Sequence, residues 1–299
     1  MATAYTQIDS NVRRTWFLMF GFFLVVIFLG WAFSWIFGSP IILIVAVSIS
    51  IVMPIISYWY SDRIVLKVSG AKEVKREEYR ELWNITENLC IASGLPMPRL
   101  YIINDPAPNA FATGRNPDNA VVAVTTGLMN ILDRSELEGV IAHELSHIKN
   151  RDILLMTTVV VLVGFVTLLS DFFLRMTIFG AVGGNRDGRA QIIMVLIGIA
   201  LAILAPIVAV LIKLAISRRR EFLADASGAL MTRYADGLAN ALEKISKAPQ
   251  PLKRANHAMA HMYISNPFGG SGRKMGFMDR LFMTHPPVEE RIKALRQTA

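Results

Sequence analysis

The sequence predicts a mainly α-helical membrane protein that carries a small β-sheet in a polar domain. Hydrophobic residues make up 53% of the 299-residue chain, which is high for a soluble protein of this length. Much of this content lies in four apolar runs of about 20 residues, the helix length that crosses a bilayer. The remaining polar sequence alternates between helical spacing and short strand-like runs. We therefore expect four transmembrane helices and one polar domain assembled from separate blocks.

The apolar runs occur as two pairs. The first pair, 16–37 and 41–60, is separated by a Gly-Ser-Pro turn and is expected to form a helical hairpin. The second pair covers 153–173 and 191–212. This pattern divides the chain into an N-terminal cytosolic segment 1–15, hairpin 16–60, a first block of the polar domain 61–152, helices three and four 153–213, and a second block of that domain 214–299.

Basic residues flank the polar ends of these runs. Arg13 and Arg14 precede the first run, and three arginines at 218–220 follow the fourth, so both termini and the polar blocks are expected in the cytosol. The same flanks explain the net charge of +8, and no basic stripe with interleaved aromatics suggests a nucleic-acid partner. The single cysteine, Cys90, excludes an internal disulfide and is expected to be a buried thiol.

The polar blocks contain the other elements. A helix with apolar residues at helical spacing runs from about Tyr79 to Cys90 and ends near Gly94. Ser135 and Glu138 form a capping-box pattern, which predicts that another helix begins near residue 135. Strands are expected at 99–104, 109–113 and 120–125, and mostly helix beyond residue 218.

The second of these helices carries the sequence HELSH at 143–147. On a helix, positions i and i+4 lie on the same face, so His143 and His147 can bind one metal ion. Glu144 then projects beside them and is expected to act as general base toward a metal-activated water. The pattern predicts one zinc ion per chain.

A catalytic zinc usually takes a third protein ligand, and a carboxylate is expected because histidines are few. Glu221 and Asp225 lie one helical turn apart, and the chain crosses the membrane twice before reaching them, so they return to the side of His147. We expect Glu221 to bind the metal, while Asp225 and Asp152 support the ligand histidines by hydrogen bonding. The alternative for the Glu221 pair is an ordinary helix with a solvated acidic face.

These motifs, together with NAFATG at 109–114 and THPP at 284–287, resemble those of the HtpX-type membrane zinc metalloproteases, which are bacterial relatives of the CAAX prenyl endopeptidases. The resemblance extends over nearly the whole chain. It implies a gluzincin-like catalytic domain and a zinc-dependent endopeptidase that cleaves membrane proteins, including misfolded ones, in quality control at the cytosolic face of the bacterial cytoplasmic membrane. It also supports Glu221 as the third ligand.

The resemblance implies further roles. Asn109, Ala110, Phe111 and Ala112 correspond to an edge strand on which an extended polypeptide substrate could pair by β-addition. His285 corresponds to a histidine that donates to the developing oxyanion.

Other classes of protein remain as alternatives. An intramembrane protease would carry its histidines inside a span, whereas this motif precedes one, behind the polar residues at 149–152. Two further alternatives are a membrane scaffold with a degenerate metal site and a prenyl-protein processing enzyme. The site could also bind another divalent ion in place of zinc. A second histidine pair, His257 and His261, lacks a following acid and is interpreted as a partly buried helix face.

Overall fold

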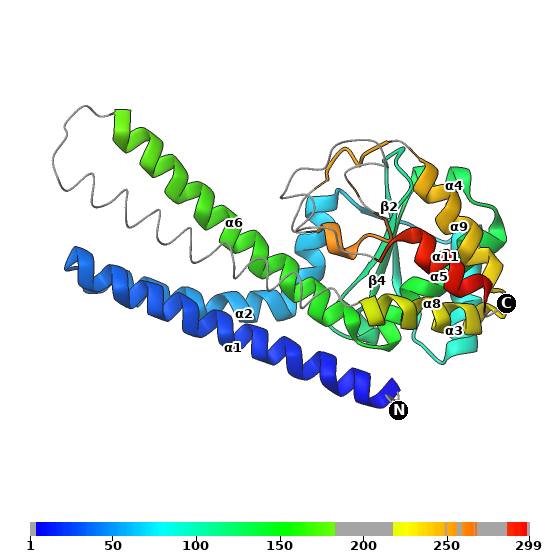
Figure 1. Cartoon of the computed structure of the whole chain (residues 1–299), viewed down its shortest axis with the longest axis horizontal. Helices are drawn as coiled ribbons and strands as arrows, with labels where there is room; N and C mark the ends of the chain where they lie inside the picture. The colour runs from blue at the N-terminus through cyan, green and yellow to red at the C-terminus, as the bar shows by residue number, and fades with distance from the viewer. Residues whose placement is uncertain are drawn as a thin grey trace.

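The computed structural model of the chain describes residues 4–182, 218–248, 250–255, 259–265, 267 and 286–297. Three long helices, α1 (Ala4–Phe37), α2 (Pro40–Ser69) and α6 (Asp152–Val182), pack together and project from a domain of shorter helices around a sheet (Figure 1). The prediction of a mainly helical protein with a small sheet is confirmed.

Two described helices are long and apolar enough to cross a membrane: Asp9–Trp35 within α1, and α2. Gly38, with φ +63°, makes the tight turn between them, as expected. Large apolar side chains such as Trp16 and Trp35 stay exposed along this hairpin, which is typical of a lipid-facing surface. A third candidate span exists if α5 (Arg134–Lys149) and the start of α6, bent by 83°, are taken together. The expected fourth run, 191–212, lies outside the described residues.

The sheet has four strands in the order β1-β2-β4-β3. Strands β2 and β4 are parallel, while β1 and β3 run antiparallel to their neighbours. The three expected strands are confirmed to within one residue, and the two-residue β1 was missed because it is too short to show a pattern. The bounds are Lys72–Glu73 for β1, Arg99–Ile103 for β2, Ala110–Thr113 for β3 and Val121–Thr125 for β4.

The sheet is buried on both faces because alternate side chains along each strand point to opposite sides. One face packs on α3 (Arg80–Ser93), α5 and α9 (Ala235–Lys247). On the other, Phe111 and its neighbours contact Met156 and Val160 of α6 and the end of α2. The core therefore continues across the expected boundary at residue 152. The remaining described elements are η1 (Pro117–Asn119), α4 (Thr126–Ile131), α8 (Arg218–Thr232), η2 (Ala260–Met262) and α11 (Val288–Arg296).

Helix α5 begins with a different capping box from the one expected. The Asp133 carboxylate accepts from the Glu136 backbone N–H at 3.0 Å, and the Glu136 side chain accepts from the Asp133 N–H at 2.8 Å. The Ser135–Glu138 assignment was wrong by two residues, because Asp133 has the extended conformation that an N-cap needs. The helix itself starts at Arg134, close to the expected position.

Helices α5 and α9 touch backbone to backbone at Gly139. A Cβ atom added there would lie 2.6 Å from the backbone nitrogen of Leu238, so the two helices would have to separate. We expect Gly139→Ala to destabilise the protein by about 1–3 kcal/mol through this overlap. Thermal unfolding in detergent measures the effect. Gly21→Ala on α1 is the matched control, because its added Cβ meets nothing within 4 Å, and an equal loss of stability in both variants would contradict the prediction.

Candidate metal centre

The end of α5 places the two motif histidines beside a sharp corner in the chain. Arg151 takes a left-handed backbone conformation, φ +57°, which costs an L-residue roughly 1–2 kcal/mol. The chain then enters α6 at an angle of 83°. As a result Asp152, the first residue of α6, lies against His147, five residues earlier in the sequence.

Three ligand atoms converge at this corner. The Nε2 atoms of His143 and His147 are 3.2 Å apart, and Glu221 carboxylate oxygens lie 3.8 Å and 3.6 Å from them. All three candidate ligand atoms lie within 4.8 Å of one another. A tetrahedral zinc with donors at about 2.0–2.1 Å separates its ligands by roughly 3.3 Å, so this spacing fits one such ion. The structure thus brings Glu221 to two histidines that precede it by 74 and 78 positions in the sequence.

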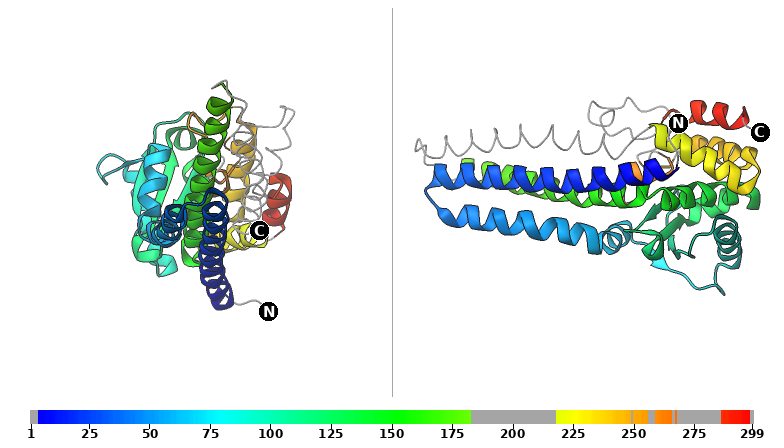
Figure 2. Two further views of the ribbon diagram at one scale, coloured as in Figure 1. Left: turned by 90° about the vertical axis from the view of Figure 1, so that its left-hand side faces the viewer. Right: turned by 90° about the horizontal axis from the view of Figure 1, so that it is seen from below.

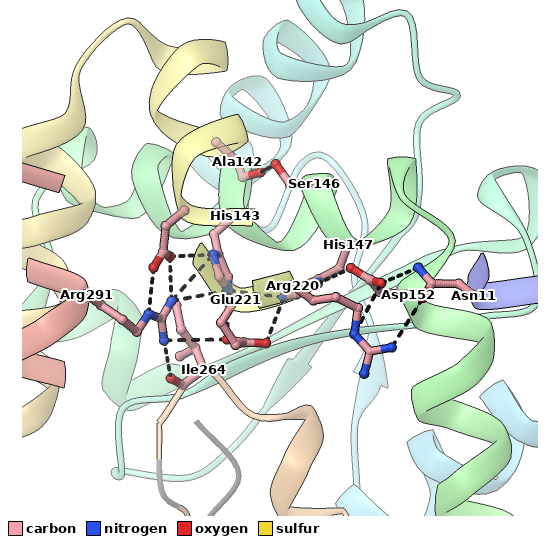
Figure 3. A network of polar contacts seen from close by, with 11 residues as sticks. Asn11, Ala142, His143, Ser146, His147, Asp152, Arg220, Glu221, Ile264 and Arg291 are labelled. Atoms are coloured by element: carbon pink, nitrogen blue, oxygen red, sulfur yellow. Dashed lines mark hydrogen bonds and ion pairs between the residues drawn. The ribbon is translucent and has the colours of Figure 1, made fainter. Parts of the chain in front are cut away.

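A carboxylate contacts the Nδ1 atom of each histidine, on the side of the ring away from the candidate metal. His143 Nδ1 lies 2.9 Å from Asp225. His147 Nδ1 lies 3.0 Å from Asp152 (Figure 3). In each ring the Nδ1–H would donate to the carboxylate, which turns the Nε2 lone pair toward the point where a metal would bind. Asp225 and Asp152 therefore lie where the sequence analysis expected them.

Arg291 is a residue of the site that the sequence analysis missed. Its guanidinium is fully buried and makes a forked interaction with Asp225, at 2.6 Å through Nη2 and 2.8 Å through Nε. Its Nη1 lies 3.7 Å from Glu221. One arginine thus holds both carboxylates of α8. A signal was present in the sequence, because Arg291 shares the inward face of α11 with Val288, Ile292 and Leu295.

The charges of the site also suit a divalent cation. Glu144, Asp152, Glu221 and Asp225 are four buried carboxylates, and Arg220 and Arg291 are two buried guanidiniums. If every carboxylate is ionised and both histidines are neutral, as ligands of a metal would be, four negative and two positive charges leave an excess of two negative charges. Because unpaired buried charge is costly, a doubly charged ion at the histidines would balance this excess, and the donor set of two imidazoles and a carboxylate suits zinc.

Burial and neighbouring charges set the pKa values here. Burial raises the pKa of Glu144 to about 7, assisted by the charge of Glu221. Burial alone would raise the pKa of Asp225, but Arg291 outweighs it and lowers the value to about 2. Glu144 is thus a base with affinity for a proton near neutral pH, whereas Asp225 stays ionised behind His143.

The expected substrate strand lies next to this centre, but it is covered. All four residues of β3 are buried, and the Ala112 backbone N–H donates to Glu144. The Ala110 carbonyl accepts from the Ile264 N–H at 3.0 Å. The Asn109 side chain donates to Ser265 O at 3.2 Å and accepts from Ser265 N–H at 3.3 Å. The chain's own 264–265 segment therefore occupies part of this edge.

Of the other residues considered in the sequence, two histidines are not described by the structure and Cys90 is. His285 and His257 lie outside the described residues. Cys90 is a free, buried thiol, as expected, and burial raises its pKa to about 11.

A candidate metal site carried by helices, in a domain attached to helices apolar enough to cross a membrane, points to the class of membrane metalloenzymes. The chain belongs to peptidase family M48, whose model matches residues 76–299. It is similar to the protease HtpX homologues of Dictyoglomus turgidum, 46% identical over 98% of this chain and 94% of the relative, and of Caldanaerobacter subterraneus subsp. tengcongensis, 47% identical over 98% and 97%. The chain therefore belongs to the HtpX-type group of this metalloprotease family.

A relative from Pyrococcus furiosus, also a protease HtpX homologue, is 50% identical over 86% of each chain. Among solved structures, the crystal structure of S. mikatae Ste24p is similar over 97% of this chain and 67% of that one, with a TM-score of 0.50 and 17% identity. At that identity the likeness concerns the fold.

Proposed function

We propose that the protein is a zinc-dependent endopeptidase that cleaves membrane proteins, including misfolded ones, at the cytosolic face of a bacterial cytoplasmic membrane. The convergence of His143, His147 and Glu221 on one point, with Glu144 beside them, supports this most strongly. Membership of a peptidase family supports a polypeptide substrate. The proposed quality-control role rests on the likeness to HtpX homologues.

The chain's residues divide the proposed work. His143, His147 and Glu221 would hold the zinc, which when bound polarises the scissile carbonyl and strengthens water as a nucleophile. Glu144 takes a proton from the attacking water and passes it to the leaving amine, and its pKa of about 7 suits both steps. We propose that His285 donates a hydrogen bond to the oxyanion.

The apolar hairpin supports a site close to a membrane surface. Helix α6 leaves the metal centre directly after His147, and α1 and α2 pack beside it (Figure 2). We propose four spans in total, with both termini and the metal centre in the cytosol.

Metal removal tests the function. Purified protein with added zinc should cleave an unfolded membrane protein, and a chelator should abolish cleavage until zinc is restored. His143→Ala should lose the bound metal, measured as zinc per chain after dialysis, together with all cleavage. A zinc-loaded protein that cleaves no polypeptide in a panel of membrane and soluble substrates would favour the scaffold class.

We propose that the substrate pairs with Asn109–Ala112 as an added strand, which requires Ile264 to release the Ala110 carbonyl. A disulfide between Asn109→Cys and Ser265→Cys should keep the Ile264 N–H bonded to the Ala110 carbonyl, because residues 109 and 265 are already in contact. We expect cleavage to fall at least tenfold on oxidation and to return with a phosphine reductant, which binds zinc weakly. The single Asn109→Cys variant is the control. A verified disulfide without loss of cleavage would place the substrate elsewhere.

A further inference from the structure

The first helix of the chain reaches the metal centre through Asn11. Asn11 lies two turns into α1, before the apolar run begins, and its side chain is 1% exposed. Its amide donates to the Asp152 carboxylate at 2.6 Å and accepts from Arg220 at 3.3 Å (Figure 3). The amide also donates to the Asn150 carbonyl at 3.0 Å.

These bonds divide the two oxygens of Asp152 between two partners. Oδ2 faces the Nδ1 of His147 at 3.0 Å, while Oδ1 is held by Asn11 and lies 3.6 Å from Arg220. A carboxylate fixed on one side presents its other oxygen in one direction, and that direction sets the plane of the His147 ring. Asn11 therefore acts on a ligand through one intermediate side chain.

The residue type at position 11 suits this contact. An amide both donates to Asp152 and Asn150 and accepts from Arg220, whereas a carboxylate there would repel Asp152. Arg220 directly precedes Glu221 in α8, so the same amide also joins the element that carries the third ligand. Asn11 is thus bonded to both parts of the chain that supply ligands.

We propose that Asn11 is a positioning residue of the metal centre, so that the cytosolic end of the first membrane helix is part of the catalytic machinery. The matched family model begins at residue 76 and leaves this helix out. The proposal rests on the metal site of the proposed function, but it concerns metal binding and needs no cleavage to be tested.

The test compares Asn11→Ala and Asn11→Asp with wild type in the full-length protein in detergent. Zinc affinity is measured by equilibrium competition with a chromophoric chelator, and the visible absorption bands of the cobalt-loaded protein report ligand geometry. We expect about tenfold weaker zinc binding and shifted cobalt bands in both variants. Thr15→Val is the matched control: it is buried one turn further along α1, and among the described residues its hydroxyl donates only to the Asn11 carbonyl of its own helix.

The outcomes separate a positioning role from a structural one. The proposal would be overturned if Asn11→Ala kept the wild-type zinc affinity and cobalt bands while the thermal midpoint of its metal-free form fell. If Asn11→Ala does not fold, Asn11→Asp decides, because it conserves size and the Arg220 contact. Wild-type protein that binds no zinc would refute the proposed function, whereas wild-type protein that binds zinc without cleaving leaves this comparison intact.

Discussion

Glu144→Gln is expected to bind zinc like the wild type and to lose peptide-bond cleavage by a factor of about 10²–10⁴. The amide is nearly the same size as the carboxylate, so the positions of His143 and His147 on α5 should be conserved. It has no proton affinity near neutral pH, and the base that the pKa of about 7 provides is therefore absent. Initial rates on an unfolded membrane protein, with zinc content determined on the same sample, measure both properties.

Glu138→Gln is the matched control for this variant. It makes the same chemical change on the same helix, at a half-buried position outside the convergence of ligands. It should retain the wild-type rate. Full activity of Glu144→Gln at normal zinc content would remove Glu144 as the base and leave another group to be found.

Arg291→Met is expected to cause the largest loss of stability, about 3–5 kcal/mol. The change removes a fully buried cation and leaves Asp225 and Glu221 facing one another without it. A loss of this size would lower the thermal midpoint in detergent by roughly 10 °C. The zinc content should fall as well, because Asp225 would no longer be held against His143.

Three companion variants isolate the cause. Arg296→Met makes the same substitution on the same helix, α11, where Arg296 forms an exposed ion pair with Glu243 of α9. This variant should lose less than about 1 kcal/mol of stability. Arg291→Lys keeps the charge without the forked geometry and should be intermediate. Combining Arg291→Met with Asp225→Asn should restore part of the stability, since fewer unpaired charges stay buried. Equal midpoints for Arg291→Met and Arg296→Met would contradict this account.

Local sequence patterns were enough to predict the helices and strands that contain them. Apolar length placed the hairpin of α1 and α2, alternation placed β2, β3 and β4, and helical spacing put His143, Glu144 and His147 on one helix. Each of these signals lies within one element, where backbone geometry relates residue spacing directly to direction. The need for a third ligand indicated Glu221 and its neighbour Asp225, the family motifs supported Glu221, and both lie beside the histidines.

Which distant residues complete the centre depends on how the helices pack. Arg291 and Asn11 have no local pattern that identifies their partners, because their bonds to Asp225 and Asp152 depend on how α11 and α1 pack. The same packing covers β3 with the 264–265 segment, which the strand sequence alone does not reveal. Buried polar groups form hydrogen bonds with whichever groups the fold places beside them. Sequence spacing does not predict a contact between residues 66 positions apart, as for Arg291 and Asp225, or 141 apart, as for Asn11 and Asp152.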